Sequence, residues 1–397
     1  MKKKILFVHH VSVVGGASYC LLSIIKELNR DKYQPVVLLR NHGTLVDELK
    51  KINVEVHFCS SLGIYPYNHS LFRLSSIRTI INVYRSFPDF EQVLVKISPD
   101  IVYFNNTFLF PYLRITKKRG VKSVIHIREH WPADQHQRQF HYVQKQIQDK
   151  ADRIVAINEY SARMISPDPN RVTIVYDWID LDKRYKPLPM SDIFGEDASK
   201  LKVYIYTGGM QRIKGAYEVL KTFSEKVLDT DSRLLVLGFT KECNGLILKG
   251  IRKKVLHFLG RPIPEFYEYC VKTLAQKDSR IVCIPSEYYI KDLFDQSYCM
   301  LSYFTIPHAN LALAEALIEG LPVIAAKTEE SLEYSRNGKM AMLFDINDIS
   351  GFENCLSELQ SHYSELKREL ELYNSELKNK FGREQNSLRL RTVLESL

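Results

Sequence analysis

Strand-length apolar runs alternate with helical spacers twice along the chain, and this alternation restricts the fold more than any other sequence feature. The first half carries the runs KKILFVHHV, PVVLLR, VEVHF, DIVYFN, KSVIHI, RIVAIN and TIVYD. After a linker rich in Pro and charge, DKRYKPLPMSDIFGEDASK, the second half carries KVYIYTGG, RLLVLGF, RIVCIPS, YCMLSYF and PVIAA. This alternation is typical of parallel sheets with helical crossovers. We therefore predict an α/β fold of two doubly wound Rossmann-like domains facing a cleft, with ligand at the carboxyl ends of both sheets.

The length of the chain agrees with two domains. Its 397 residues, 45% of them hydrophobic, are enough for each domain to bury its own core. We expect a first domain over residues 1–183 and a second domain over residues 184–378. A last helix over residues 379–397 could return to the first domain.

The cysteines and the N-terminal segment point to a cytoplasmic protein. The seven cysteines lie far apart, without a CxxC pair or a Cys/His spacing suited to zinc, so we expect reduced thiols. The basic, apolar start imitates a signal peptide, but His9 and His10 interrupt it, which favours a first buried strand. No run reaches the ~20 apolar residues of a spanning helix. We expect a cytoplasmic protein that is soluble or peripheral on the inner face of the membrane.

The net charge of +9 lies wholly in the first half of the chain. Residues 1–180 hold 25 Lys and Arg against 16 Asp and Glu, which leaves 30 basic and 30 acidic residues for the remainder. Such asymmetry favours an anionic partner, either a membrane surface or a phosphate-bearing substrate, and a merely solvated surface is the alternative.

The same half contains a candidate membrane-docking surface. RITKKRGVKS is a basic cluster, and the segment from Leu62 to Phe90 interleaves aromatic residues with arginines. The residues concerned are Tyr65, Tyr67, Phe72, Tyr84 and Phe87 with Arg73, Arg78 and Arg85. We predict docking on anionic membrane. Nucleic-acid binding is disfavoured because no recognition module is present, and the plainer account places these aromatics in the core.

Two glycine-containing turns between a strand and a helix are candidate phosphate sites. Gly15 and Gly16 follow the first strand, without the GxGxxG fingerprint of dinucleotide folds. The second turn, TGGMQRIKGAYEVL, carries Gly209, Arg212 and Lys214. Loop amides, a helix start and two cations suit a diphosphate, although the Walker A order is missing. Ordinary tight turns and solvated charges are the alternatives.

The stretch IHIREHWPAD ends a buried strand with a group of candidate catalytic residues, His126, Arg128, Glu129 and His130. Polar groups just past the carboxyl end of a parallel strand lie where such folds place their chemistry. His126 could instead point into the core by strand alternation. The two histidines lack a third ligand in sequence, so we expect no metal.

Glu315 interrupts the apolar stretch IPHANLALAEALIEGLPVIAA. We predict a helix from Ala309 to Glu319 on which Glu315 shares a face with Glu319 and His308. Gly320 and Pro322 then end the helix ahead of a buried strand. A carboxylate in such an apolar helix needs a partner, and a ribose diol would supply two hydroxyl donors. A solvent-facing stripe is the alternative.

These residues resemble the retaining nucleotide-sugar glycosyltransferases of the GT-B fold, family 4, also called glycosyl transferases group 1. The likeness covers nearly the whole chain, through GGASYCLLSIIKEL, ADRIVAINEYSARMI, VYDWIDLDKRY and the Lys214–Gly215 pair. The most specific match is AEALIEGLPVIA, which is close to the family's LEAMAxGxPVIA. The resemblance implies that residues 1–183 form the acceptor-side domain and residues 184–378 the donor-binding domain. It further implies that Glu315 holds the donor ribose and that Lys214, with Arg212, holds the diphosphate. It also implies that Gly16 borders the donor phosphates, and the further donor-binding candidates are Pro285, His308, Asn310 and Leu311.

The chain departs from the family's pattern at several positions. Pro307 stands where relatives have a first glutamate, Gly209 where they have an arginine, and Asp177 and Trp178 where they have Asn-Gly. We interpret the sequence as an enzyme that transfers a sugar from a nucleotide diphosphate donor to a hydroxyl of a glycan or lipid-linked acceptor, with retention. No metal or cofactor is expected, and surface polysaccharide or glycoconjugate synthesis is the expected context. A catalytically silent partner of another transferase is the alternative, and a nicotinamide oxidoreductase is disfavoured because its fingerprint is absent.

Overall fold

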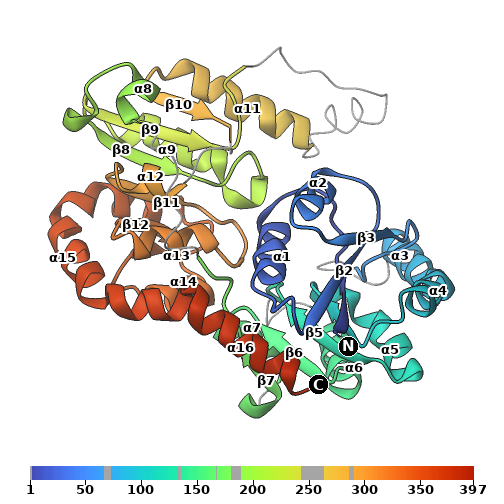
Figure 1. Ribbon diagram of the computed structural model, residues 1–397. Coiled ribbons are helices and arrows are strands. Elements are labelled where there is room, and N and C mark those ends of the chain that lie inside the picture. Colours follow the sequence, from blue (N-terminus) through green and yellow to red (C-terminus); the bar gives the residue numbers. More distant parts are fainter. Residues whose placement is uncertain are drawn as a thin grey trace. The chain divides into compact units, whose positions relative to one another are not determined.

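The computed structural model describes residues 2–66, 73–131, 136–166, 168–179, 189–242, 263–285 and 290–397. The chain divides into two compact units. Unit 1 comprises Met1–Asp180 together with Lys380–Leu397, and unit 2 comprises Leu181–Asn379. Each unit contains one parallel sheet flanked by helices (Figure 1), so both have the predicted doubly wound form.

The sheet of unit 1 has seven strands in the order β3-β2-β1-β4-β5-β6-β7, and all neighbours are parallel. Its strands are β1 (Lys3–Val8), β2 (Tyr33–Leu39), β3 (Glu55–Phe58), β4 (Ile101–Phe104), β5 (Lys122–Ile127), β6 (Arg153–Ala156) and β7 (Val172–Ile174). The chain order reverses between β1 and β4, where Val8 is in register with Phe104. Such a switch point is where doubly wound sheets bind ligands.

Helices cover both faces of this sheet. They are α1 (Gly16–Lys26), α2 (Thr44–Lys51), α3 (Leu74–Arg85), α4 (Phe87–Ile97), α5 (Leu113–Arg119), α6 (Gln137–Lys150), α7 (Glu159–Ile165) and α16 (Arg383–Glu395), with short 3-10 turns at Thr107–Tyr112 and Pro169–Arg171. Leu6 and Val8 belong to one core and Ile5 and Phe7 to the other, because successive strand residues point to opposite faces. Two buried faces explain why the last four residues of β1, Ile5 to Val8, are all apolar.

The C-terminal helix α16 is part of unit 1. Leu390, Val393 and Leu394 are buried in the same core as Ile5 and Phe7. A parallel bridge joins Ile179 to Gly382, and the Asn386 side chain accepts a hydrogen bond from the Tyr176 backbone N–H at 2.9 Å. The last residues of the chain therefore complete the core formed by its first strand.

The sheet of unit 2 has six parallel strands in the order β10-β9-β8-β11-β12-β13. They are β8 (Lys202–Tyr206), β9 (Ser232–Leu237), β10 (Ile281–Ile284), β11 (Cys299–Ser302), β12 (Val323–Ala326) and β13 (Met342–Phe344). The helices are α8 (Met190–Phe194), α9 (Ala216–Lys226), α11 (Pro264–Lys277), α12 (Ile290–Phe294), α13 (Leu311–Ile318), α14 (Glu329–Tyr334) and α15 (Ile349–Phe381), with 3-10 turns at Ala198–Lys200 and Arg212–Lys214. The chain order reverses between β8 and β11, which places the switch point beside the Lys214 loop.

Among the residues that the structure describes, no helix has the length and apolar character needed to span a bilayer.

Candidate functional site

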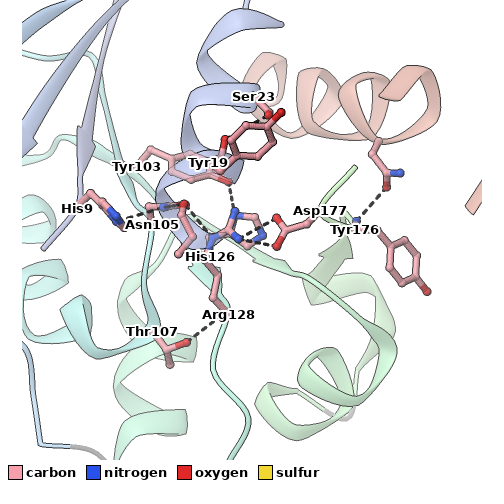
Figure 2. A network of polar contacts seen from close by, with 12 residues as sticks. His9, Tyr19, Ser23, Tyr103, Asn105, Thr107, His126, Arg128, Tyr176 and Asp177 are labelled. Atoms are coloured by element: carbon pink, nitrogen blue, oxygen red, sulfur yellow. Dashed lines mark hydrogen bonds and ion pairs between the residues drawn. The ribbon is translucent and has the colours of Figure 1, made fainter. Parts of the chain in front are cut away.

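The carboxyl edge of the unit 1 sheet carries a network of polar side chains (Figure 2). His9 follows β1, Asn105 follows β4, Arg128 follows β5, and Asp177 comes shortly after β7. The sequence predicted only the β5 member of this network, although His9 and Asn105 are likewise the first polar residues after their strands. Their position directly after a strand could therefore have identified His9 and Asn105 from the sequence.

Arg128 is the centre of the network. Its Nη1 donates to both carboxylate oxygens of Asp177 at 2.8 Å, and its Nε donates to the Asn105 side-chain oxygen at 2.9 Å. The two charged side chains are only 5% and 20% exposed. Burial opposes the charge of Arg128, but Asp177, together with the nearby Cys20 and Tyr103, outweighs it and raises the pKa of Arg128 above its ordinary value. Its remaining nitrogen, Nη2, is buried and makes no hydrogen bond within the described structure.

His9 is held as a neutral imidazole. The Ser18 hydroxyl donates to the Val13 carbonyl at 2.8 Å, so toward His9 Nε2, at 3.1 Å, it acts as an acceptor. The Asn105 amide lies 3.3 Å from His9 Nδ1 and can only donate there. Both ring nitrogens are thus satisfied in one tautomer. Burial, followed by the neighbouring His10 and Arg128, lowers the pKa of His9 to about 3.

His126 faces the interior of unit 1. Its Nδ1 lies 2.8 Å from the Tyr103 hydroxyl, whereas its Nε2 is buried and has no hydrogen-bond partner among the described residues. Burial, and secondly the charge of Arg128, lowers the pKa of His126 well below its ordinary value. Strand alternation had suggested this inward orientation.

The other two β5 candidates are also held by neighbours. Glu129 accepts hydrogen bonds from the Asn106 side-chain amide and, at 2.9 Å, from the Thr107 backbone N–H. Burial raises the pKa of the Glu129 carboxyl despite these donors. The His130 ring stacks on the Tyr160 ring at a centroid distance of 4.3 Å. The structure therefore brings the four residues together, and each is engaged by other parts of unit 1.

Gly15 and Gly16 stand at the start of α1 beside open space. A Cβ atom built on either residue would meet no other atom within 4 Å. Gly15 is in an extended conformation, and no side chain caps the helix. The first amides of α1 are thus left without a side-chain acceptor, as the sequence reading of a phosphate site requires.

The glycine loop of unit 2 is shaped by close packing. The Tyr206 hydroxyl lies 3.2 Å from the Gly209 carbonyl oxygen and 3.0 Å from that of Lys214. Gly215 has a φ of +70°, and a Cβ there would lie 2.2 Å from the Tyr303 carbonyl oxygen. Only glycine fits at such a position. The loop that carries Lys214 is therefore fixed from inside the unit.

Lys214 is a half-buried cation without an internal partner. No hydrogen bond or ion pair of its ammonium group occurs among the residues that the structure describes. Burial lowers the pKa of Lys214. Arg212 is exposed and also has no side-chain partner in the described part of the chain. The Thr305 backbone N–H donates to the Ile213 carbonyl at 2.9 Å, so this loop lies against the segment that leads from β11 to α13.

Glu315 lies on α13, which starts later than predicted. Asn310 caps the helix by accepting from the Leu313 N–H at 3.2 Å, and its amide donates to Ser302 Oγ at 2.8 Å. The helix therefore begins at Leu311 instead of Ala309, and His308 lies outside it. The predicted face shared by His308 and Glu315 was wrong for this reason. His308 instead contacts the Phe304 ring at 5.6 Å.

The Glu315 carboxylate has no hydrogen bond or ion pair within the described residues. Burial, followed by the nearby Glu319 charge, raises the pKa of Glu315 to about 7. Glu319 on the same helix differs, because it pairs with Lys291 Nζ at 2.9 Å. A carboxylate in an apolar helix needs a hydrogen-bond or charge partner. The described part of unit 2 supplies none for Glu315.

The remaining donor-binding candidates lie in loops of unit 2 or at the start of α13. Pro285 is exposed directly after β10, Leu311 is half-buried at the start of α13, and Gly209 follows β8 with a φ of +61°. All three positions follow the carboxyl end of a strand, as the loops of a doubly wound sheet require.

No group of three or more His, Cys, Asp or Glu side chains in the described ranges is placed to hold a metal ion. The sequence contains two DxD matches, a pattern that can bind metal, at residues 180–182 and 229–231. The first lies outside the described ranges. In the second match, Asp229 lies 3.4 Å from Lys202 Nζ, in the turn between α9 and β9.

Comparison with known proteins supports the architecture. Residues 15–178 match the model of the glycosyl transferase 4-like domain. HepE of Anabaena, solved with UDP and glucose, has a TM-score of 0.73 at 16% identity, with 100% of both chains covered. The fold is GT-B. No curated protein sequence matches the chain.

Two further GT-B structures extend this likeness. A glycosyltransferase from Rickettsia africae has a TM-score of 0.68 at 15% identity, with 100% of this chain and 98% of the other covered. The lipopolysaccharide outer core galactosyltransferase WaaB has a TM-score of 0.59 at 16% identity, with 99% of each chain covered. At such low identity these likenesses establish the fold and leave the reaction to be inferred from the site.

Proposed function

We propose that this chain is a glycosyltransferase that moves a sugar from a nucleoside diphosphate donor to a hydroxyl of a glycan or lipid-linked acceptor, with retention at the anomeric carbon. One observation carries the proposal: Lys214 and Glu315 are both half-buried, and neither has a partner in the described structure. Unpaired charges at least partly removed from water are unfavourable unless a ligand completes them. A nucleoside diphosphate offers an anion for one and hydroxyl donors for the other.

In the proposed donor complex, Lys214 and Arg212 hold the diphosphate and stabilise the charge that develops on it as the glycosidic bond breaks. The Glu315 carboxylate accepts hydrogen bonds from the ribose hydroxyls. Because hydrogen bonds to the ionised form favour that form, donor binding lowers the pKa of Glu315 from about 7. The carboxyl, which is about half ionised at pH 7 without ligand, then becomes mostly ionised when the donor is bound.

The IHIREH segment is proposed to line the acceptor side. His126 Nε2 and Arg128 Nη2 are buried nitrogens without hydrogen bonds among the described residues, so both have hydrogen-bonding capacity left. Gly15 and Gly16 in the same unit leave open space in which donor phosphates could approach the first amides of α1. The proposed setting is surface polysaccharide or glycoconjugate synthesis in the cytoplasm. WaaB, which has the same fold, acts in lipopolysaccharide outer core synthesis.

A catalytically silent partner of another transferase is the second candidate. Pro307 occupies the place of the first glutamate that the related family uses at the donor sugar. Such a partner would bind nucleotide and turn over no nucleotide sugar.

Thermal unfolding with UDP, GDP, ADP and CMP tests the proposal first, because a ligand that binds only the folded chain raises its unfolding temperature. We expect at least one diphosphate to raise it and the matching nucleoside to raise it far less. Release of the nucleoside diphosphate from the corresponding nucleotide sugar then distinguishes the two candidate functions. A transferase should release it, and a silent partner should not. No stabilisation by any nucleotide would contradict both.

A further inference from the structure

Helix α3 of unit 1 turns apolar side chains toward solvent. Leu74 is 85% exposed, Ile77 42%, Ile81 44% and Tyr84 39%. Their spacing of three, four and three residues places them along one side of the helix. We call these four residues the α3 stripe. An exposed apolar stripe of this kind usually marks an interaction surface.

The stripe is separate from the side of α3 that packs on the protein. Ser76 and Val83 are buried, Ile80 is half-buried against the unit 1 core, and Phe87 at the start of α4 continues this inner line. The inner line is the part of α3 that joins the unit 1 core. The four stripe residues lie outside that core cluster, and the Tyr84 ring contacts the Phe87 ring at a centroid distance of 5.1 Å.

The charge around the stripe is uniformly positive. Residues 56–88 contain no Asp or Glu. Arg73, Arg78 and Arg85 are exposed, and none of them forms an ion pair with a described residue. Arg78 and Arg85 each follow a stripe residue directly, so they lie along the edge of the stripe.

Neighbouring helices extend this surface. The Tyr84 hydroxyl lies 3.4 Å from that of Tyr142, which is 41% exposed on α6. Burial and the contact with Tyr84 raise the pKa of Tyr142, and the positive charge of the nearby Arg114 partly opposes this rise. Arg114 on α5 is exposed, and residues 135–148 also lack Asp and Glu. Cations and amphipathic aromatic tips thus adjoin the α3 stripe on the α5 and α6 side.

We propose that the α3 stripe docks on an anionic lipid bilayer, with Arg78, Arg85 and Arg114 meeting the headgroups. A helix with an apolar side bordered by cations is the form that lies in the plane of a membrane interface. A protein partner would need acidic residues around an apolar centre. An anionic bilayer presents negatively charged headgroups above an apolar interior everywhere on its surface. This inference goes beyond the proposed reaction and holds whether or not the chain transfers a sugar.

The structure changes which residues carry the docking. Tyr65 was expected on the surface, but it is 4% exposed and belongs to the core. Phe87 is half-buried against the same core, and Tyr67 and Phe72 lie outside the described residues. Tyr84 is the member of the predicted aromatic set that lies in the stripe. Aliphatic side chains that the sequence reading passed over make up the rest.

Flotation with vesicles tests the proposal. We expect the full chain to float with vesicles of phosphatidylcholine and phosphatidylglycerol at low salt, to float less as salt is added, and to stay behind with phosphatidylcholine alone. The double variant Ile77→Asn/Ile81→Asn should lower the bound fraction on the order of tenfold, and Arg78→Gln/Arg85→Gln by a similar factor. Leu388→Asn, which replaces a 53% exposed leucine on α16, is the matched control and should bind as the parent does.

Three outcomes would overturn the proposal. They are no flotation with anionic vesicles, equal binding by the stripe variants and the control, and a self-associated parent that the stripe variants convert to monomer without any vesicle binding. The last would assign the stripe to a second copy of the chain. Unfolding midpoints of all variants should equal that of the parent, and sedimentation velocity measures the self-association.

Discussion

The charged side chains at the carboxyl edges of the two sheets differ in whether they have partners. In unit 1, Arg128 and Asp177 neutralise one another and Asn105 completes the set. In unit 2, Lys214 and Glu315 have no partner among the described residues. The same topology thus produces one edge whose charges are paired and one whose charges are unpaired among the described residues.

This difference separates stability from binding. A buried pair that is complete makes folding depend on both members, because removal of one leaves the other charged and unpaired. An unpaired half-buried charge contributes nothing favourable to folding, so its removal should leave the fold unchanged or more stable. We therefore expect substitutions at the unit 1 edge to affect unfolding, and those at the unit 2 edge to affect ligand affinity.

The largest effect is expected for Asp177→Ala. The Arg128 guanidinium would remain 5% exposed without its carboxylate, which should lower the free energy of unfolding by about 3 kcal/mol. Urea unfolding followed by circular dichroism measures it. Glu395→Ala is the control, because the Lys32–Glu395 pair is at the surface and should change stability little. Equal free energies of unfolding for the two variants would mean that the buried pair stabilises the fold no more than the surface pair does.

Lys214→Ala should weaken UDP binding by about 1.5 to 3 kcal/mol, the range for hydrogen bonds to charged groups, and leave uridine binding nearly unchanged. Its unfolding free energy should not fall, since the ammonium has no partner to lose. Calorimetric titration measures both ligands. Lys221→Ala, an exposed lysine on α9, serves as the control and should bind UDP as the parent does. Parallel losses of UDP and uridine affinity in Lys214→Ala would point to a distorted loop instead of a lost anion contact.

Glu315→Gln keeps the shape of the side chain and removes its charge. Donor affinity should fall by about 1 to 3 kcal/mol, and the discrimination between UDP and 2′-deoxy-UDP should narrow. The paired Glu319 provides the control variant Glu319→Gln, which breaks the contact with Lys291 and should keep that discrimination. A Glu315→Gln variant that separates the two ligands as well as the parent does would leave Glu315 with a structural role.

The pH dependence of Glu315 has a defined sign. Its folded pKa of about 7 exceeds the ordinary value of 4.5, so the folded chain holds a proton that the unfolded chain has released between these values. Stability from this group is full below pH 4.5 and is lost as pH rises through 7. Glu315→Gln should therefore gain about 3 kcal/mol over the parent at pH 8 and little at pH 4.5, by urea unfolding at both pH values. A gain that does not change with pH would contradict the raised pKa.

Unit 1 should respond to pH in the opposite direction and with a smaller effect near neutrality. His9 has a folded pKa of about 3 against 6.5 when unfolded, so its contribution is full above pH 6.5 and is lost as pH falls. At pH 5.5 the loss should be about 1 kcal/mol. His9→Gln, compared with the parent at pH 7 and 5.5, should show a shallower decline. An unchanged decline would assign the acid sensitivity to other groups.

Local sequence patterns predicted the elements well where burial decides them. KKILFVHHV contains β1 and PVIAA contains β12. A short continuous apolar run is typical of a strand that is buried on both faces. The start of α13 was misplaced because the Asn310 cap depends on Ser302, which belongs to a different strand. Periodicity cannot detect such a contact.

Long-range pairing limited the prediction of the site. Nothing in IHIREH shows that His126 meets Tyr103 or that Arg128 meets Asp177, which lies far along the chain. Asp177 was noticed only as a departure from a related family's motif. The Lys214 loop and Glu315 were identified because glycines, caps and apolar flanks act over a few residues. Whether they have partners could be decided only in three dimensions.

We infer that the unpaired charges of unit 2 belong to a nucleotide site and that the paired charges of unit 1 belong to the fold. The rise in unfolding temperature that UDP causes in the parent, in Asp177→Ala and in Lys214→Ala tests both halves of this inference. Asp177→Ala should unfold at a lower temperature and keep the full UDP-induced rise. Lys214→Ala should unfold at the parent's temperature and lose most of the rise. A full rise in Lys214→Ala, or a lost rise in Asp177→Ala with its fold intact, would contradict it.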